Sequence, residues 1–221
     1  MKSEKLTEAR RRYDDACGTS LALEFVGERW SLLIMREMVY GPRRFGEIKA
    51  NLPGISANVL TQRLESLEDA GIVVRRKLPS PANVQVYELT AWGLESQTVM
   101  REMGRWATRS HRHDPMLFFS PASAMMSLQT LVEPDAARES ETVQFRFPAD
   151  SFVVRADGAG VDVTRGESAD VDATFAGDTM AMRVTIYGKL PFGAPEGMTM
   201  TGDLAAAQRF VDLFRLPKKI A

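Results

Sequence analysis

The chain has 221 residues, of which 44% are hydrophobic and 26% charged, a composition typical of a globular protein long enough for two modest domains. Its net charge of −1 combines two halves of opposite sign. Residues 1–113 hold 18 Lys and Arg against 14 Asp and Glu, a net charge of +4, and residues 114–221 hold 10 against 15, a net charge of −5. The composition excludes a wholly disordered chain. The chain has no long apolar run, and its N-terminus is charged. We therefore expect no membrane span, no signal peptide and a cytoplasmic location.

The first half predicts a series of helices followed by a β-hairpin. Residues 3–13 read as a polar, exposed arm or helix, and Thr19 is suited to cap a helix that ends at Gly27. Helical spacing of apolar residues then predicts helices at 29–39 and 45–51. From residue 72 the period changes to two, which predicts strands at 72–78 and 84–89 joined by a Pro-rich turn.

Between the short helix and the hairpin, residues 56–71 predict one complete helix. Ser56 is a suitable N-cap and Gly71 a suitable end. One face of this helix is apolar and carries Leu60, Leu64 and Leu67. The opposite face carries Asn58, Thr61, Gln62 and Glu65. Short helix, turn, longer helix and hairpin together predict a winged helix-turn-helix, with an ordinary amphipathic surface helix as the alternative reading of residues 56–71.

Distinctive motifs of this half lie at Cys17 and at residues 27–34, 41–45, 52–56, 60–64, 67–68, 70–71 and 87–90. Together these motifs resemble those of the HxlR family of bacterial transcription regulators. The resemblance covers residues 17–94 without a gap. It implies a homodimeric winged helix-turn-helix protein that binds near-palindromic, double-stranded operator DNA.

Within that resemblance, side-chain chemistry assigns roles to individual residues. Amide and hydroxyl groups read base edges, so Asn58, Thr61 and Gln62 are the predicted base contacts. The predicted phosphate contacts are Arg43, Arg44, Ser56 and Arg63, with Arg75, Arg76 and Lys77 at the base of the wing. For any single arginine, the alternative is a solvated surface charge.

A last helix of the first half is predicted from residue 91 to about residue 110, with Thr90 as its cap. Its stripe of Trp92, Val99, Met103 and Trp106 has nearly heptad spacing. We expect this stripe, with the N-terminal segment, to form the homodimer contact. The alternative is that the stripe packs only on its own domain.

Cys17 lies at a cysteine position common in the family, and some relatives of this kind use it to sense oxidants or electrophiles. Sensing needs a thiol of lowered pKa, and the neighbours Asp14 and Asp15 give no evident means of lowering it. The run at residues 111–114 holds three potential metal ligands but lies in a linker, so we predict no metal and no cofactor. Because no catalytic grouping is recognisable, we expect no enzyme activity.

Asp114-Pro115 marks the predicted domain boundary, which gives domains at 1–113 and 114–221. The second half predicts a helix from Ser120-Pro121 to Pro134, strands at 143–147, 152–155, 161–164 and 171–175, a helix at 178–187, a strand at 198–201 and a final helix from Asp203. This pattern predicts an α+β domain in which helices cover an antiparallel sheet with one apolar face.

The order of the segments at 169–175, 198–203 and 205–214 looks like that of a sterol-carrier-protein-like domain, over residues 128–216. That resemblance implies an apolar tunnel for lipids or similar molecules. Carried over to this chain, the candidate lining residues are Phe145, Phe147, Phe175, Met182, Ile186, Met198, Met200, Phe210 and Phe214. A plain hydrophobic core would show the same set of residues.

Taken together, these features predict a homodimeric, sequence-specific DNA-binding transcriptional regulator. A small apolar effector bound by the second domain would bias DNA affinity, or that domain would only stabilise the dimer. Two alternatives remain open: a thiol-based redox or electrophile sensor acting through Cys17, and a lipid or small-molecule carrier with an accessory DNA-binding domain.

Overall fold

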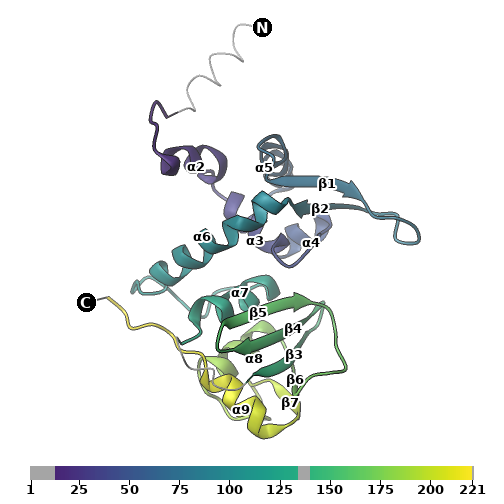
Figure 1. The fold of residues 1–221 in the computed structure, drawn as a ribbon, viewed down its shortest axis with the longest axis vertical. Coiled ribbons are helices and arrows are strands. Elements are labelled where there is room, and N and C mark those ends of the chain that lie inside the picture. Colours follow the sequence, from purple (N-terminus) through teal and green to yellow (C-terminus); the bar gives the residue numbers. More distant parts are fainter. Residues whose placement is uncertain (1–12, 134–139, 221) are drawn as a thin grey trace, which may run out of the picture. The chain divides into compact units, whose positions relative to one another are not determined.

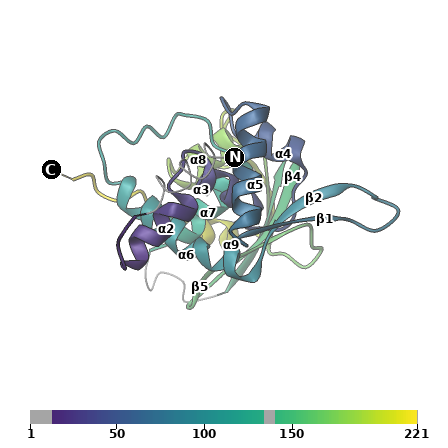
Figure 2. The ribbon, with the colours of Figure 1, turned by 90° about the horizontal axis from the view of Figure 1, so that it is seen from above.

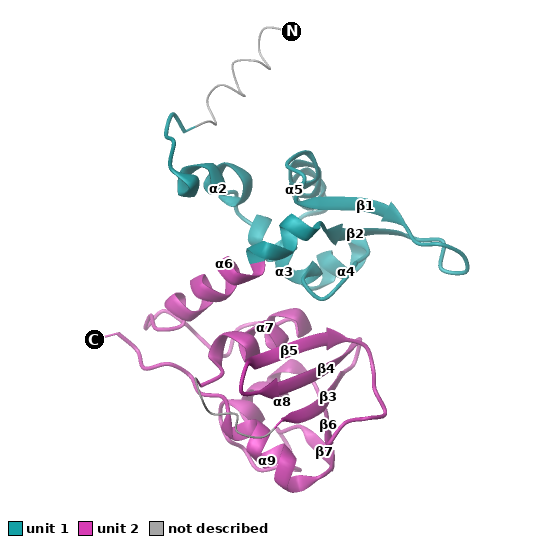
Figure 3. Cartoon of the chain, in the orientation of Figure 1, with its two compact units in different colours: residues 1–96 teal, residues 97–221 magenta. Residues whose placement is uncertain are grey.

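The computed structural model describes residues 13–133 and 140–220, so the predicted N-terminal arm lies outside the described residues except for its last one. The chain divides into two compact units, residues 1–96 and 97–221 (Figure 3). The domain boundary expected at residue 113 stays a prediction. In the described part of the chain, no helix is both long and apolar enough to cross a membrane.

The first unit is a winged helix-turn-helix, as predicted (Figure 1). Its elements are α2 (Gly18–Val26), α3 (Ser31–Met38), α4 (Phe45–Ala50), α5 (Ala57–Asp69), β1 (Val73–Lys77) and β2 (Gln85–Leu89). The next helix, α6 (Ala91–Ala107), begins in this unit and ends in the second. The Thr90 hydroxyl accepts a hydrogen bond from the Gly93 amide at 3.0 Å, which confirms the predicted cap of α6.

One predicted cap in this unit is wrong. α2 begins at Gly18 with Cys17 as its N-cap residue, so Thr19 already lies inside the helix. The Cys17 amide donates to Asp15 Oδ1 at 3.0 Å, and the Ser20 hydroxyl donates to Asp15 Oδ2 at 2.6 Å. Asp15 thus binds the start of α2 from outside the helix, a contact that a scan for capping residues alone does not detect.

The second unit is an α+β fold. Its elements after α6 are α7 (Pro121–Leu131), β3 (Glu141–Phe147), β4 (Asp150–Asp157), β5 (Gly160–Arg165), β6 (Ala173–Ala176), α8 (Thr179–Ile186), β7 (Thr199–Gly202) and α9 (Leu204–Asp212). The strands form one sheet in the order β5-β4-β3-β6-β7. Ser120, Asp178 and Asp203 cap α7, α8 and α9 through their side chains, as predicted.

The sheet is mixed rather than antiparallel, because β3 and β6 pair in parallel, with Val143 opposite Ala173 and Phe145 opposite Phe175. β5 runs in the same direction as β3, since each pairs antiparallel with β4. The loop at 166–172 then returns the chain to the starting end of β3 before β6 begins. At the start of this loop, the Gly166 amide donates to the Ser151 carbonyl. At its end, the Asp172 amide donates to the Thr142 carbonyl. The return of this loop gives β6 the direction of β3.

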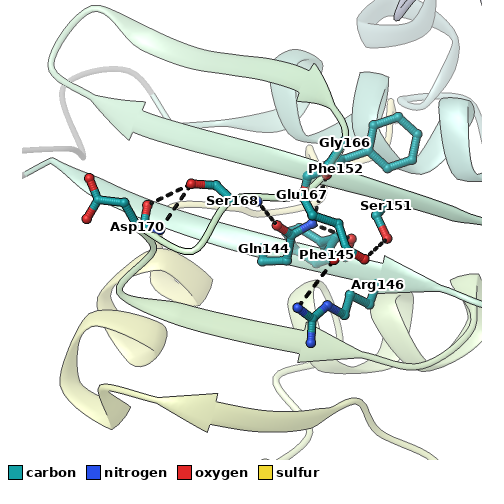
Figure 4. Close-up of polar contacts among 9 residues, drawn as sticks. All are labelled: Gln144, Phe145, Arg146, Ser151, Phe152, Gly166, Glu167, Ser168 and Asp170. Carbon is teal, nitrogen blue, oxygen red and sulfur yellow. Dashed lines mark hydrogen bonds and ion pairs between the residues drawn. The ribbon is translucent and has the colours of Figure 1, made fainter.

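A buried glutamine holds that returning loop in place (Figure 4). The Gln144 side chain is fully buried; its Nε2 donates to the carbonyls of Phe152 and Gly166 at 3.0 Å, and its Oε1 accepts from the Ser168 amide at 3.0 Å. Nearer the surface, the Ser151 hydroxyl donates to Glu167 at 3.1 Å. The polar groups of the amide are therefore satisfied inside an otherwise apolar strand.

Candidate nucleic-acid interface

Both ends of α5 are formed by the residues expected from the sequence. The Ser56 hydroxyl accepts a hydrogen bond from the Val59 amide at 3.2 Å. Gly54 and Gly71 have φ angles of +90° and +72°, a left-handed conformation that glycine adopts without a Cβ clash. The helix therefore begins and ends at fixed points in the domain.

The apolar face of α5 attaches it to the first unit. Leu60, Leu64 and Leu67 are at most 1% exposed, and α5 packs against α3 and β1. Each fully buried leucine contributes about 1.5–3 kcal/mol relative to an exposed one. These three side chains are therefore sufficient to hold the helix in one rotational setting.

The opposite face of α5 is polar and exposed. Asn58, Thr61 and Gln62 all lie on the surface, and within the described part of the chain no hydrogen bond or ion pair engages their side chains. Their donors and acceptors are thus available to a partner. Compact amide and hydroxyl groups in the first turns of a helix have the chemistry that reads base edges in a DNA major groove.

A tryptophan in a strained conformation lies beside the turn before α5. Trp30, the N-cap residue of α3, has a φ of +85°, which is unusual for a bulky side chain. Its ring lies next to Gly54, where a Cβ would be 3.9 Å from Trp30 Cη2. The Arg29 guanidinium stacks on the same ring, 5.4 Å from its centroid. A residue far away in the sequence therefore lies beside the turn that leads into α5.

The four predicted phosphate contacts around α4 and α5 differ in exposure. Arg44 is exposed, whereas Arg43 is 7% exposed and exchanges two backbone hydrogen bonds of 2.8 Å with Tyr87. Arg63 is partly buried and ion-paired with Glu28 at 3.5 Å. Ser56 uses its hydroxyl for the helix cap. Only Arg44 of these three arginines thus has an exposed side chain, and the burial of Arg43 is unfavourable for a phosphate contact.

The hairpin of β1 and β2 projects as a wing from the helices of the first unit (Figure 2). Val73 is buried at its base, and the next residues of β1 are exposed, including Arg75, Arg76 and Lys77. Arg76 is ion-paired with Glu88 on β2. The wing therefore presents a basic strand whose middle charge is already partly neutralised.

Lys49 is a further exposed cation that the sequence interpretation did not include. It lies in the last turn of α4, next to the buried Ile48. The first helix of a helix-turn-helix crosses the DNA backbone. Because the helical period places Ile48 in the core, it places the next residue, Lys49, on the surface. This pattern in the sequence is sufficient to identify Lys49 as an exposed cation.

The predicted dimer stripe on α6 is exposed in this single chain. Trp92 is 49% exposed, Val99 54%, Met103 48% and Trp106 77%. α2 has no buried residue, and its Phe25 packs edge-on against Trp92 with 5.6 Å between ring centroids. Large apolar side chains exposed along one helix are typical of a protein-protein contact.

Cys17 is exposed at the N-terminus of α2. The backbone amide of Thr19, then its hydroxyl and the amide of Ser20, lower the pKa of the Cys17 thiol. The expectation that nothing near Cys17 lowers its pKa is therefore wrong. The groups that lower this pKa belong to the start of α2, which begins at Gly18, directly after Cys17.

The predicted tunnel residues of the second unit lie together in its core. Phe145, Phe175, Phe210 and Phe214 are fully buried, and neighbouring ring centroids are 5.0–6.0 Å apart. Of the other five, all are buried except Met200, which is partly exposed: Phe147, Met182, Ile186, Met198 and Met200. This packing is that of a hydrophobic core covered by α7, α8 and α9, and the tunnel role stays a prediction.

The comparisons with known proteins match the first half of the chain. The family model described as HxlR-like helix-turn-helix matches residues 25–115. The HTH-type transcriptional regulator YodB of Bacillus subtilis (strain 168) is 41% identical over 86 residues, 39% of this chain and 77% of that protein. The uncharacterized regulator YvaP of the same organism is 38% identical over 88 residues, 39% of this chain and 81% of that protein.

Among solved structures, the reduced form of YodB from B. subtilis has 36% sequence identity. It covers 45% of this chain and 100% of that chain, with a TM-score of 0.40.

Proposed function

Because the chain belongs to the HxlR-like helix-turn-helix family of transcriptional regulators, we propose that it binds operator DNA as a homodimer. In this proposal α5 enters the major groove and the wing of β1 and β2 lies along the neighbouring phosphates. The relatives are named as regulators and the family is not known for enzymes, so the chain is a regulator and not an enzyme.

The observation that carries this proposal is the division of α5 into two faces. Leu60, Leu64 and Leu67 are buried, whereas Asn58 and Gln62 are exposed and have no side-chain partner among the described residues. Arg44, Lys49 and the basic residues of β1 support it, since exposed cations beside a reading helix hold phosphates.

We further propose that the second unit has a sterol-carrier-like fold and binds a small effector. The support is a five-stranded sheet whose apolar side is covered by three helices. An effector changes DNA binding only if it binds one DNA-affinity state better than the other. Otherwise the second unit serves to stabilise the dimer.

The recognition assignment is tested by the double variant Asn58→Ala/Gln62→Ala. We expect it to lose preference for operator over unrelated DNA, because each good bidentate contact contributes about 1–3 kcal/mol of discrimination. Selection from a random duplex library, followed by competition binding, measures this preference. Asp69→Ala, an exposed change at the far end of α5, is the matched control.

In both variants, affinity for DNA of any sequence should still fall steeply with salt, because the phosphate contacts remain. A double variant that selects the same sequence as the unaltered protein contradicts the assignment of α5 as the reading helix.

A second candidate function, thiol-based sensing, is favoured by the exposure of Cys17 and the lowered pKa of its thiol. The thiolate fraction at neutral pH should exceed that of an unstructured cysteine peptide, so alkylation by iodoacetamide should be faster than in the peptide. When the alkylation rate is plotted against pH, the midpoint for the protein should lie at a lower pH than the midpoint for the peptide. In the variant Thr19→Ala, the midpoint should rise.

Cys17→Ser is the control for labelling at this site, since Cys17 is the single cysteine of the chain. Equal midpoints for protein and peptide would exclude an activated thiol. If alkylation leaves operator affinity unchanged, Cys17 is reactive but does not act as a sensor.

A further inference from the structure

The second unit contains an apolar cavity that is separate from the predicted tunnel residues. It has a volume of about 190 Å³ and is lined by parts of α7 and α8, by the segment at 113–119 and by Leu216 near the C-terminus. The apolar walls are formed by Phe119 and Leu131 and, on the side open to solvent, by the exposed Leu117 and Phe118. None of the nine predicted tunnel residues lines it.

The volume limits the size of an occupant. A cavity of about 150 Å³ lined by apolar side chains accepts benzene, whereas pockets for drug-sized molecules begin at about 300 Å³. The observed volume therefore fits a single aromatic ring with one small substituent. The aromatic walls at Phe118 and Phe119 provide ring contacts for such a molecule.

Arg183 gives the cavity one buried positive charge. This residue of α8 is only 8% exposed; its Nη2 donates to the Leu117 carbonyl at 2.9 Å, and its guanidinium lies 5.2 Å from the Phe119 ring centroid. Its Nη1 is buried without a hydrogen-bond partner among the described residues, and the carboxylates of Asp114 and Asp178 act on its charge from a distance. A buried cationic donor without a partner is costly, so an acceptor at this position would be bound favourably.

The other polar groups of the cavity do not replace that acceptor. Asp114 also lines it but is exposed, and its Oδ1 accepts from the Met116 amide at 2.8 Å, so water screens its charge. The Tyr187 hydroxyl is bonded to the Ser127 hydroxyl at 2.7 Å, and burial raises the pKa of Tyr187, which keeps it neutral. The cavity thus combines apolar walls with the hydroxyls of Thr108, Ser127 and Tyr187, the His113 imidazole, the exposed Asp114 carboxylate and one buried guanidinium, that of Arg183.

We propose that this cavity binds a small aromatic carboxylate, with the ring against the apolar walls and the carboxylate on Arg183. A carboxylate is the preferred partner of guanidinium because charge-assisted hydrogen bonds are stronger than neutral ones. This inference deepens the proposed function, since it gives the effector a site and a chemical class. The binding step itself can be measured without DNA.

The first test is calorimetric titration of the full chain with sodium benzoate, benzyl alcohol and sodium acetate. Benzoate should bind, benzyl alcohol of similar size should bind about tenfold more weakly, and acetate should not bind measurably. Absence of benzoate binding, or equal affinity for the acid and the alcohol, would overturn the proposal.

The second test removes the cation. Arg183→Met should weaken benzoate binding about tenfold or more and leave benzyl alcohol binding unchanged. The melting temperature of Arg183→Met without ligand should not fall. Loss of the hydrogen bond to Leu117 destabilises the fold, but removal of a buried charge stabilises it. Arg155→Met, at an exposed arginine of β4, is the matched control and should bind benzoate normally. Normal benzoate binding by Arg183→Met would contradict the assignment.

A third measurement does not depend on any variant. In methyl NMR spectra of the unaltered chain, benzoate should shift the signals of Leu117, Leu131 and Leu216, which line the cavity. Shifts confined to other leucines would overturn the proposal. Operator affinity is measured separately without ligand. Absence of ligand binding in the cavity would therefore not contradict the DNA-binding proposal. Benzoate binding without any change in operator affinity would support the site and contradict the effector role.

Discussion

At the scale of single residues, Gln144 shows how one buried amide directs the course of the chain. It joins β3 to β4 and to the loop that precedes β6, so the parallel pairing of β3 with β6 depends on its hydrogen bonds. A polar group is retained in this core because the loop carries backbone groups that need a partner. The residue therefore specifies topology in addition to filling space.

We predict that Gln144→Leu lowers the free energy of unfolding by about 3 kcal/mol, because each buried polar group left unsatisfied costs about 1–3 kcal/mol. Chemical denaturation followed by circular dichroism measures the change. Gln208→Leu, at an exposed glutamine of α9, is the control and should change stability by at most about 0.5 kcal/mol. Equal stability of the two variants would show that the Gln144 network contributes nothing.

At the scale of elements, the turn between α4 and α5 sets where α5, the proposed reading helix, begins. Gly54 has a φ of +90°, and its neighbour across the turn is the strained Trp30. Any residue with a Cβ is disfavoured in this conformation, although a Cβ here would meet only Trp30 Cη2, at an ordinary contact distance of 3.9 Å. The turn is thus fixed by backbone geometry more than by packing.

Gly54→Ala should therefore destabilise the first unit by about 1–2 kcal/mol, the cost of a left-handed conformation for an L-residue. Gly46→Ala is the matched control: Gly46 lies in α4 with no atom near its missing Cβ, so alanine should stabilise that helix by up to about 1 kcal/mol. Thermal unfolding of both variants measures the two effects. If Gly54→Ala and Gly46→Ala changed the free energy of unfolding in the same direction, this explanation of the turn would be wrong.

Most elements were predictable from the sequence because their signals are local. Ser56 and Gly71 lie next to the helix that they delimit, and the leucine period of α5 lies within it. Contacts between distant parts of the chain were not predictable in this way. The pairing of Arg63 with Glu28 and the bridge of Arg43 to Tyr87 join residues far apart in sequence, so two arginines expected to contact phosphate have intramolecular partners.

The same distinction explains the errors and omissions in the second unit. Alternating apolar residues predicted most of its strands but contain no information on whether neighbours run parallel, so the β3 and β6 pairing was missed. The cavity at Arg183 was also missed, since it forms where segments at 113–119, 127–131 and 183–187 meet. Its sequence signal is a single arginine in a short helix.

At the scale of the whole molecule, the charge difference between the two halves of the sequence is larger than that between the two compact units. Counted over the two compact units, residues 1–96 hold 14 Lys and Arg against 13 Asp and Glu, a net charge of +1, and residues 97–221 hold 14 against 16, or −2. The excess of positive charge in residues 1–113 therefore comes from the arginines at 101–112. In the proposed DNA complex, attraction to phosphates would therefore come from the local arrangement of cations on the wing and α4, and the net charge of the unit would add little.

Dimer formation is the whole-molecule property most open to a direct test. Trp106→Glu should convert the proposed homodimer to a monomer that still folds, because a charge replaces the most exposed apolar side chain of the α6 stripe. Operator affinity should fall with it, since two reading helices must lie about 34 Å apart along the DNA. Light scattering and circular dichroism measure assembly and folding.

Thr98→Glu, at another exposed position of α6 about a quarter turn from the stripe, is the control and should remain dimeric. If Trp106→Glu remains a dimer as stable as the unaltered protein, the interface lies elsewhere.

The separation of α5 into a buried and an unpartnered face has a consequence for how such a protein evolves. Asn58, Thr61 and Gln62 make no side-chain hydrogen bond among the described residues, so folding places little constraint on their identity. Mutation can explore these three positions while the leucine face keeps the domain folded. A combinatorial library randomised at these positions is therefore a practical route to variants of altered sequence preference.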